Sequence, residues 1–247
     1  MKKYIAYFDF LGFKEFIDNN DLENQKRSMG HIFREIEIAL GQENVKEAPQ
    51  GIIADLSKSK VNAINFSDTI VFFTNDDTKD SLIEILKVAF KFNWRTNGYV
   101  FPARGALVFG EIIYVPHSEK SEFNAVYNVN SVFGKGLVDA HIKAESQNWA
   151  GTVIDESFIS QINELGLNHQ DIIPKYAKKY KVPYKNISFH EEEYVLNFIE
   201  GHMDKAAFKN YSKGIERNFS EYNKSINHPS VKNKLENTVE FLKSYLK

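Results

Sequence analysis

The sequence predicts an α+β fold, in which helices cover one face of a largely antiparallel sheet and a C-terminal helical extension follows. Over the first part of the chain, strand-like and helical runs alternate in the order strand, helix, hairpin, helix, hairpin, helix, strand. Beyond Asp155 the pattern changes to a basic, aromatic segment and two helical runs. We therefore expect a domain at 1–155 and an extension at 156–247 that packs on the same domain.

The first half of the domain is expected to form a strand, a helix and a hairpin. Residues 3–10 alternate with period two and carry aromatic or aliphatic side chains on both faces, which indicates a central strand covered on each side. Residues 22–40 have apolar side chains at helical spacing, and the mixed polar stretch 43–59 is expected to be a loop. Residues 61–73 indicate a hairpin with a tight turn at 67–69.

The second half of the domain is expected to contain a helix, a strand pair, a helix and a strand, at 79–95, 103–109 with 111–115, 133–147 and 152–154. Asp76-Asp77-Thr78 can cap the first of these helices. The strand pair is expected to be hinged at Gly110. The second helix begins with Gly134 and Gly136.

The extension is expected to contain a basic loop and two helices. Residues 175–185 hold five lysines and no acid, which suits a solvated surface loop or, alternatively, a contact with phosphate or with a partner. Residues 203–226 and 231–246 show helical spacing, with a break at His228-Pro229.

Composition limits both the partners and the chemistry. The chain has 31 Lys and Arg against 33 Asp and Glu, a net charge of -2, whereas a nucleic-acid partner would call for a basic surplus. It has no cysteine, so chemistry falls to carboxylates, hydroxyls, Lys, Arg and the 7 His. No apolar run reaches the roughly 18 residues that a bilayer requires. We expect a cytoplasmic protein that does not insert into a membrane.

Two aspartates stand in otherwise apolar strand segments. Asp9 ends the first strand, and Asp68 lies in the turn of the first hairpin. A carboxylate at the end of a buried strand is costly unless a cation or hydrogen bonds compensate it. If the two strands are neighbours, both carboxylates reach one edge of the sheet, where their oxygens suit Mg²⁺. The alternative is that Asp9 caps the turn at Gly12 and that Asp68 is an ordinary turn residue.

Two cationic side chains add to this pattern. Arg104 is the one charged residue in the apolar run 102–110, and a guanidinium that cannot lose its proton needs an anion there. The helix opened by Gly134 and Gly136 offers free amides at its start, and Lys143, about two turns later, could face an anion.

These segments together resemble the catalytic domain of class III nucleotidyl cyclases. The runs that carry the resemblance are YFDFLGFK, NFSDTIVFF, ARGALVFGE and FGKGLVDAHIKAES, and they are most similar to the pyrimidine cyclases of Pycsar antiphage systems. The resemblance covers about residues 3–155. It implies the ferredoxin-like sandwich of class III cyclases and a head-to-tail homodimer with two active sites at its interface.

The resemblance also implies a site. Asp9 and Asp68 would hold two Mg²⁺ or Mn²⁺ ions, helped by the main-chain carbonyl of Phe10. Three backbone amides would cradle the triphosphate, those of Leu11, Gly12 and Phe13. Arg104 would bind the charge of the triphosphate. The reaction would be attack of the ribose 3′-oxygen on the α-phosphorus, with loss of pyrophosphate.

The chain departs from mammalian-type adenylyl cyclases, which act on a purine nucleotide, where the base is read. In place of a purine-reading lysine it has Ile64-Asn65, and strand alternation lets only one of the two face the site. Asn65 could read an amide or carbonyl edge of a pyrimidine. In place of an Asn and an Arg on the later helix it has Asp139 and Lys143, and a lysine lacks the planar fork of an arginine, which leaves the transition-state role of Lys143 open.

We therefore expect a metal-dependent cyclase that converts UTP or CTP to the 3′,5′-cyclic monophosphate. Its product would be a second messenger in antiphage defence, read by a separate cyclic-nucleotide-responsive effector. Two alternatives stand beside it. The first is a catalytically silent nucleotide sensor with a cyclase-like fold, which the residues at 139 and 143 favour, and the second is a purine cyclase.

Overall fold

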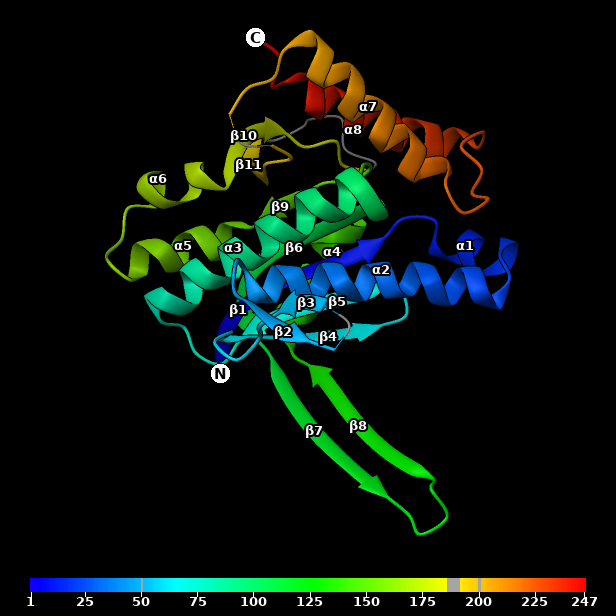
Figure 1. Ribbon diagram of the computed structural model, residues 1–247. Coiled ribbons are helices and arrows are strands. Elements are labelled where there is room, and N and C mark those ends of the chain that lie inside the picture. Colours follow the sequence, from blue (N-terminus) through cyan, green and yellow to red (C-terminus); the bar gives the residue numbers. More distant parts are fainter. Residues whose placement is uncertain (50, 186–191, 200) are drawn as a thin grey trace.

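The computed structural model describes residues 1–49, 51–185, 192–199 and 201–247. A seven-stranded sheet runs through the molecule in the spatial order β10-β11-β9-β6-β1-β5-β4 (Figure 1). Its strands are, in chain order, β1 (Lys2–Phe10), β4 (Val61–Phe66), β5 (Thr69–Thr74), β6 (Ala103–Glu111), β9 (Thr152–Ile154), β10 (Ala177–Lys181) and β11 (Glu192–Leu196). Neighbouring strands are antiparallel except β6 and β9, which are parallel. The predicted α+β class with a largely antiparallel sheet is confirmed.

Helices cover both faces of the sheet, where one face was expected. The long helices α2 (Leu22–Gly41) and α3 (Lys79–Arg95) share an apolar core with Tyr4, Ala6, Phe8 and Phe10 of β1. Helix α4 (Lys135–Glu145) packs on the opposite face, against Ile5 and Tyr7. The reason lies in β1 itself, because it carries large apolar side chains on both faces and each face needs a cover.

Most of the expected elements of the domain are present, namely β1, α2, the β4–β5 hairpin, α3, α4 and β9. Thr78 is the N-cap of α3, as its side chain accepts a hydrogen bond from the Ser81 amide. A short helix, α1 (Phe13–Asn19), and a π-helical turn at Thr96–Val100 were not predicted. Both follow directly after another element, so neither has enough length to show a period of its own.

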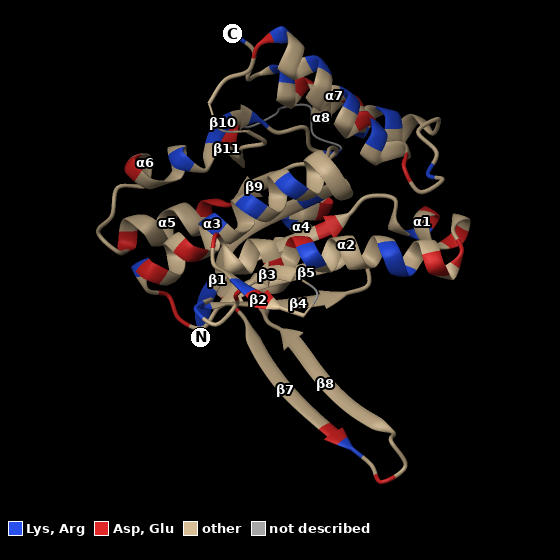
Figure 2. Cartoon of the chain, viewed as in Figure 1, with Lys and Arg blue, Asp and Glu red and all other residues tan. Residues whose placement is uncertain are grey.

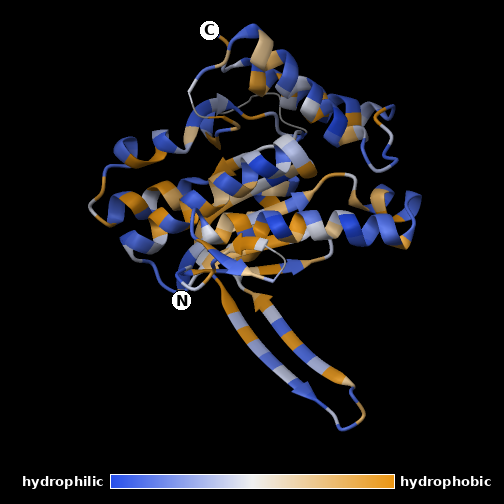
Figure 3. Cartoon of the chain, in the orientation of Figure 1, coloured by the Kyte–Doolittle hydropathy of each residue, from blue (hydrophilic) through white to orange (hydrophobic). Residues whose placement is uncertain are grey.

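The strand pair expected around Gly110 is wrong. Strand β6 continues through Gly110, and β7 (Ile113–Lys120) pairs with β8 (Val126–Phe133) in a separate hairpin. Gly110 is needed for close packing instead, because a Cβ built there would lie 2.6 Å from the Cα of Gly136 at the start of α4. The β7–β8 hairpin projects from the body (Figure 1). Its arms alternate hydrophobic and hydrophilic residues (Figure 3) and carry Lys, Asp or Glu only toward the tip (Figure 2).

Two segments that were expected to be loops contain strands. Within 43–59, β2 (Val45–Ala48) pairs with β3 (Gly51–Ala54). Within 175–185, β10 pairs with β11, and the register sets Lys181 opposite Glu192. The basic segment therefore forms a strand by pairing with β11, which comes later in the chain.

The extension contributes both strands and helices to the same body. After α5 (Glu156–Glu164) and α6 (His169–Ile172), which leads into a 3-10 turn at Ile173–Lys175, strands β10 and β11 join the main sheet. Helices α7 (Lys205–Ser220) and α8 (Pro229–Lys243) form a second apolar core with Trp149 and Phe241 at its centre. Within the described residues, no helix has the length and apolar character that crossing a bilayer demands. The domain boundary at 155 stays a prediction.

The segment between α7 and α8 lies against the start of α1. Gly12, with φ of 79°, precedes this helix, and the Cδ of Lys224 would lie 3.1 Å from a Cβ added at Gly12. The Lys224 ammonium donates to the carbonyl of Asn218 at 2.8 Å and lies 3.6 Å from the centre of the Phe101 ring. Burial lowers the pKa of Lys224 to about 7.

We expect Lys224→Met to change the pH dependence of stability. Between pH 7 and the ordinary lysine pKa of 10.5, the unfolded chain holds a proton that the folded protein has lost, so wild-type stability rises with pH there. Methionine keeps the apolar stem and removes this titration. The free energy of unfolding of the variant, relative to wild type, should therefore fall by about 2–3 kcal/mol from pH 6 to pH 9 in urea titrations. Lys213→Met, at an exposed lysine of α7, is the control. A pH-independent difference between Lys224→Met and wild type would contradict the expectation.

Candidate functional site

Three charged side chains lie together at the end of β1. Asp9 on β1 is opposite Arg104 on β6 and Thr69 on β5, so these residues form one row across the sheet. Asp68 precedes Thr69, in the two-residue turn between β4 and β5. The amide of Phe10 donates to the carbonyl of Asp68 at 2.9 Å, which holds the main chains beside the two aspartates together. The structure thus places Asp9, Asp68 and Arg104 near one another, while their role as a site stays a prediction.

Arg104 is a buried cation between two carboxylates, with only 8% of its side chain exposed. Its Nε donates to Asp9 Oδ2 at 2.9 Å, and a terminal nitrogen lies 2.8 Å from the same oxygen. The other partner is Glu145, at the end of α4, which forms an ion pair with the guanidinium through its carboxylate and accepts a hydrogen bond at its main-chain carbonyl, 3.3 Å away. The anion that Arg104 requires is therefore supplied within this chain, and Glu145 is a site residue that the sequence did not reveal.

The surroundings of Asp9 disfavour its charge. Burial raises the pKa of Asp9, and the nearby carboxylate of Asp68 raises it further, whereas Arg104 and His141 act in the opposite direction. The Tyr7 hydroxyl lies 3.0 Å from Nδ1 of His141 on α4, and burial raises the pKa of Tyr7 as well. Tyr7 and His141 were missed because a Tyr in a core strand and a His in a surface-type helix carry no signal until the sheet and α4 are packed together.

The donor set fits a hard divalent cation. A cation shared by Asp9 and Asp68 would offset both the desolvation of Asp9 and the repulsion between the two carboxylates. Mg²⁺ commonly takes one or two carboxylates together with waters and phosphate oxygens, so it does not require a cage made wholly of protein ligands. Such a cage is not seen, since the described residues contain no cluster of three or more His, Cys, Asp or Glu suited to a metal.

The two residues expected to read a base point in different directions. Ile64 lies opposite Val71 and packs on the α4 face of the sheet, the face that carries Asp9. Asn65 lies opposite Ile70, which belongs to the core on the other face. The Asn65 amide donates to the carbonyl of Thr69 at 3.2 Å and thereby holds the β4–β5 turn. Of the two, Ile64 shares the face of the site.

The predicted phosphate cradle is only partly available. The amide of Leu11 donates to the carbonyl of Pro102 at 2.8 Å, so it is already occupied. Gly12 caps α1 and Phe13 begins it, and amides in a first helical turn have no carbonyl within the helix to bond to. The turn after β1 thus offers the amides of Gly12 and Phe13 rather than all three.

Lys143 is held away from the row of Asp9 and Arg104. Its ammonium lies 2.5 Å from a carboxylate oxygen of Glu193 and 3.7 Å from one of Asp155. In the described part of the chain, no hydrogen bond or ion pair joins it to Asp9, Asp68 or Arg104.

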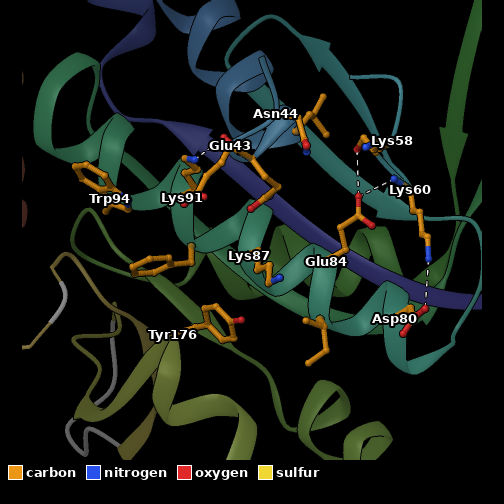
Figure 4. Close-up of a pocket in the computed structure, with 15 residues that line it drawn as sticks. Glu43, Asn44, Lys58, Lys60, Asp80, Glu84, Lys87, Lys91, Trp94 and Tyr176 are labelled. Atoms are coloured by element: carbon orange, nitrogen blue, oxygen red, sulfur yellow. Dashed lines mark hydrogen bonds and ion pairs between the residues drawn. The ribbon is translucent and has the colours of Figure 1, made fainter. Parts of the chain in front are cut away.

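A cavity of about 910 Å³ lies along the outer side of α3 (Figure 4). Two of its lysines have partners within the chain. Lys60 forms an ion pair with Asp80 at 3.4 Å, and Lys91 donates a hydrogen bond to the main-chain carbonyl of Gln42 at 2.6 Å. Helix α3 packs on the sheet face opposite to the one that carries Asp9, so this cavity is separate from the candidate site.

Comparison with known proteins identifies the fold. No protein-family profile and no curated protein sequence matches the chain. Among solved structures, it is similar to the catalytic core of a rhodopsin-guanylyl cyclase with converted specificity in complex with ATPαS, with a TM-score of 0.52 and 8% identity over 79% of this chain and 95% of that one. It is also similar to the guanylate cyclase domain of RhGC from Catenaria anguillulae in complex with GTP, with a TM-score of 0.50 and 10% identity over 79% and 96% of the two chains.

A third similar structure is a non-canonical dimeric guanylyl cyclase domain of the RhoGC fusion protein from the aquatic fungus Blastocladiella emersonii, with a TM-score of 0.51 and 10% identity over 79% of this chain and 95% of that one. At such low identity these likenesses establish the fold alone. The chain has the class III nucleotidyl cyclase fold, as its motifs predicted.

We expect Asp9→Asn and Arg104→Met to affect the metal-free protein in different ways. Because the pKa of Asp9 is raised in the folded state, the stability that this group contributes at low pH is lost as the pH rises through that pKa. Asp9→Asn removes this loss, so the stability of the variant relative to wild type should rise from pH 4 to pH 8. Arg104→Met leaves two carboxylates without their shared cation and should cost about 3 kcal/mol at pH 8.

Urea unfolding in the presence of EDTA measures both differences. If Asp9→Asn proved more destabilising than Arg104→Met at pH 8, Arg104 would not be the cation on which the charges of Asp9 and Glu145 depend.

Proposed function

We propose that this protein is a metal-dependent nucleotidyl cyclase that converts UTP or CTP to the 3′,5′-cyclic monophosphate and pyrophosphate. The observation that carries the proposal is the placement of Asp9 and Asp68 beside the buried Arg104, in a chain with the class III cyclase fold. Two of the similar structures are complexes with ATPαS and GTP, which supports a nucleoside triphosphate as the ligand.

In this proposal Asp9, Asp68 and the main-chain carbonyl of Phe10 hold two Mg²⁺ or Mn²⁺ ions. When bound, such ions neutralise the triphosphate and make the ribose 3′-hydroxyl a better nucleophile. The 3′-oxygen attacks the α-phosphorus, the bond to the bridging oxygen breaks, and pyrophosphate leaves with that oxygen.

The chain's own residues orient the substrate. The amides of Gly12 and Phe13 would bind phosphate oxygens, and Arg104 would stabilise the charge that develops on the leaving group. To do so, Arg104 must exchange one carboxylate for phosphate. Glu145 is the partner that can give way, because 44% of its side chain is exposed, against 15% for Asp9.

Pyrimidine specificity is proposed on the base-reading positions. The site face carries Ile64, with no lysine in the place where mammalian-type adenylyl cyclases have one. Asn65 would reach a base only if its amide left the β4–β5 turn, so we assign the exclusion of purines to the shape around Ile64. A purine cyclase is the second candidate, favoured by the purine nucleotides of the similar structures.

Lys143 has a proposed part in stabilising the transition state. Its ion pairs with Glu193 and Asp155 would have to open first. The same ion pairs favour the alternative of a nucleotide sensor without catalysis, because they keep the Lys143 ammonium bound to Glu193 and Asp155 and away from the row of Asp9 and Arg104.

The proposed setting is a head-to-tail homodimer in the cytoplasm. Its cyclic product would act on a separate effector in antiphage defence, as the resemblance of the sequence to Pycsar cyclases implies. The non-canonical dimer of the guanylyl cyclase domain from Blastocladiella emersonii supports an assembly of two chains, and the head-to-tail arrangement rests on the resemblance of the sequence.

We expect the purified protein to convert a pyrimidine triphosphate when it is incubated with each of the four nucleoside triphosphates and Mn²⁺. Asp9→Asn and Asp68→Asn should each lower the rate by at least about 100-fold, because each removes a ligand of the metals. Asp80→Asn, at a carboxylate that is 79% exposed, should leave the rate unchanged. Mass spectrometry of the products measures all of these.

Three results would overturn parts of this proposal. Wild-type turnover in either Asp9→Asn or Asp68→Asn would remove the two-metal mechanism. A preference for ATP or GTP would replace the pyrimidine substrate. Nucleotide binding without any product would favour the sensor.

We further expect the specific activity to fall on dilution. If each site lies at the interface of a dimer, dissociation removes the site, and the activity should follow the dimer fraction measured by light scattering. Specific activity that stayed constant while the protein became monomeric would contradict the proposed assembly.

A further inference from the structure

The C-terminal extension places a lysine directly beside the partners of Arg104. The ammonium of Lys185 lies 3.5 Å from one carboxylate oxygen of Glu145, and the other oxygen of that carboxylate pairs with Arg104. The amide of Lys185 donates to the carbonyl of Ser146 at 2.7 Å, immediately after the end of α4. This bond fixes Lys185 next to the buried guanidinium.

A second lysine approaches the same place from α8. The hydroxyl of Thr238 accepts a hydrogen bond from the amide of Ala150 at 2.8 Å and donates to the carbonyl of Lys234 at 2.7 Å. Lys234 therefore lies one turn before Thr238, on the side of α8 that meets the body of the domain. It interacts electrostatically with Arg104 and Lys185, and it is half-buried.

The resulting cluster has more cations than anions. Arg104 pairs with the carboxylates of Asp9 and Glu145, and Lys185 pairs with Glu145. Lys234 interacts electrostatically with Arg104, Lys185 and Asp9. If Asp9 binds a metal ion, the three cations are left with one carboxylate. Burial lowers the pKa of both lysines, and the charge of Arg104 lowers each further. Half-buried cations crowded in this way are stabilised by an anion between them.

A purely structural role does not account for both lysines. Lys185 has an ion pair with Glu145, which such a role would explain. For the Lys234 ammonium, however, the described residues provide no hydrogen bond and no ion pair within 4.0 Å. An ammonium that is half-buried among other cations, with no partner of its own, indicates a ligand that the folded chain alone does not supply.

We propose that Lys185 and Lys234 bind phosphate oxygens of the nucleoside triphosphate, so that the C-terminal extension completes the site that the sheet begins. This inference rests on the proposed function, because it takes Asp9 and Asp68 as the metal end of the same site. The ligand class is a polyphosphate rather than a monophosphate, since three cations from three parts of the chain can contact several adjacent charged groups at once. Each lysine acts as a point charge on its flexible stem.

Binding of inorganic triphosphate tests the inference without catalysis. Isothermal titration calorimetry of the full-length protein with inorganic triphosphate and Mg²⁺ would compare wild type with Lys185→Met and Lys234→Met. Each substitution keeps the apolar stem and removes one charge-assisted contact, so each should weaken binding about tenfold or more. Lys185→Arg and Lys234→Arg should restore most of the affinity.

Matched controls lie within four residues of each lysine in the sequence. Lys181→Met is at an exposed lysine of β10, and Lys232→Met is at a lysine of α8 that is 68% exposed. Both should bind inorganic triphosphate as wild type does, and circular dichroism should show an unchanged fold in all variants. The inference is overturned if wild type binds no triphosphate, or if both cluster variants bind it with wild-type affinity.

The outcomes separate this inference from the proposed function. Loss of triphosphate binding in the cluster variants, in a protein that forms no cyclic product, would support the phosphate site and reject the cyclase. Cyclic product formed by both cluster variants with wild-type KM would support the cyclase and reject the phosphate site.

Discussion

The site depends on one interaction, a buried guanidinium that bridges a strand and a helix through two carboxylates. Arg104 on β6 contacts Asp9 on the neighbouring strand and Glu145 at the end of α4. Replacing a buried ion pair by apolar side chains often leaves a protein as stable or makes it more stable, so stability alone does not explain this arrangement. We interpret the buried guanidinium as a cation that is held in place for an anionic ligand. The surrounding sheet and α4 hold the three groups at contact distance, and in the proposed function a phosphate replaces the more exposed partner, Glu145.

Much of the sheet that carries this interaction could be predicted from local patterns. Strand β1 has period two on both faces, and Asp9 stands out because it interrupts that period with a charge. The β7–β8 hairpin could not be predicted in the same way. Both of its arms are largely exposed, and the sequence around Gly110 favours a turn until the close approach of Gly136 is known. Strand β10 depends on pairing with an acidic strand later in the chain, which is a non-local contact.

The details of the site show a similar limit. The polar character of Asp68 and Arg104 marked them in the sequence, because each is unusual where it stands. Whether Ile64 or Asn65 faces the site depends on the register of β4 against β5, and a shift of one residue would exchange them. Glu145 is one of several charged residues on a helix, and its sequence neighbours do not distinguish it. Its importance follows from where α4 ends relative to β6, a matter of packing that the helical period does not encode.

The extension meets the domain at both sides of this site. Lys224 covers the turn at Gly12 with its stem, and Lys185 reaches Glu145 beside Arg104. These two contacts come from separate parts of the extension, on either side of α7, so moving the extension as a unit would disturb the turn after β1 and the ion pairs of Arg104 together. A change in sequence at residue 155 therefore need not be a boundary in function. The sheet places the two aspartates, and later residues place Lys185 beside the ion pairs of Arg104 and the stem of Lys224 over the turn at Gly12.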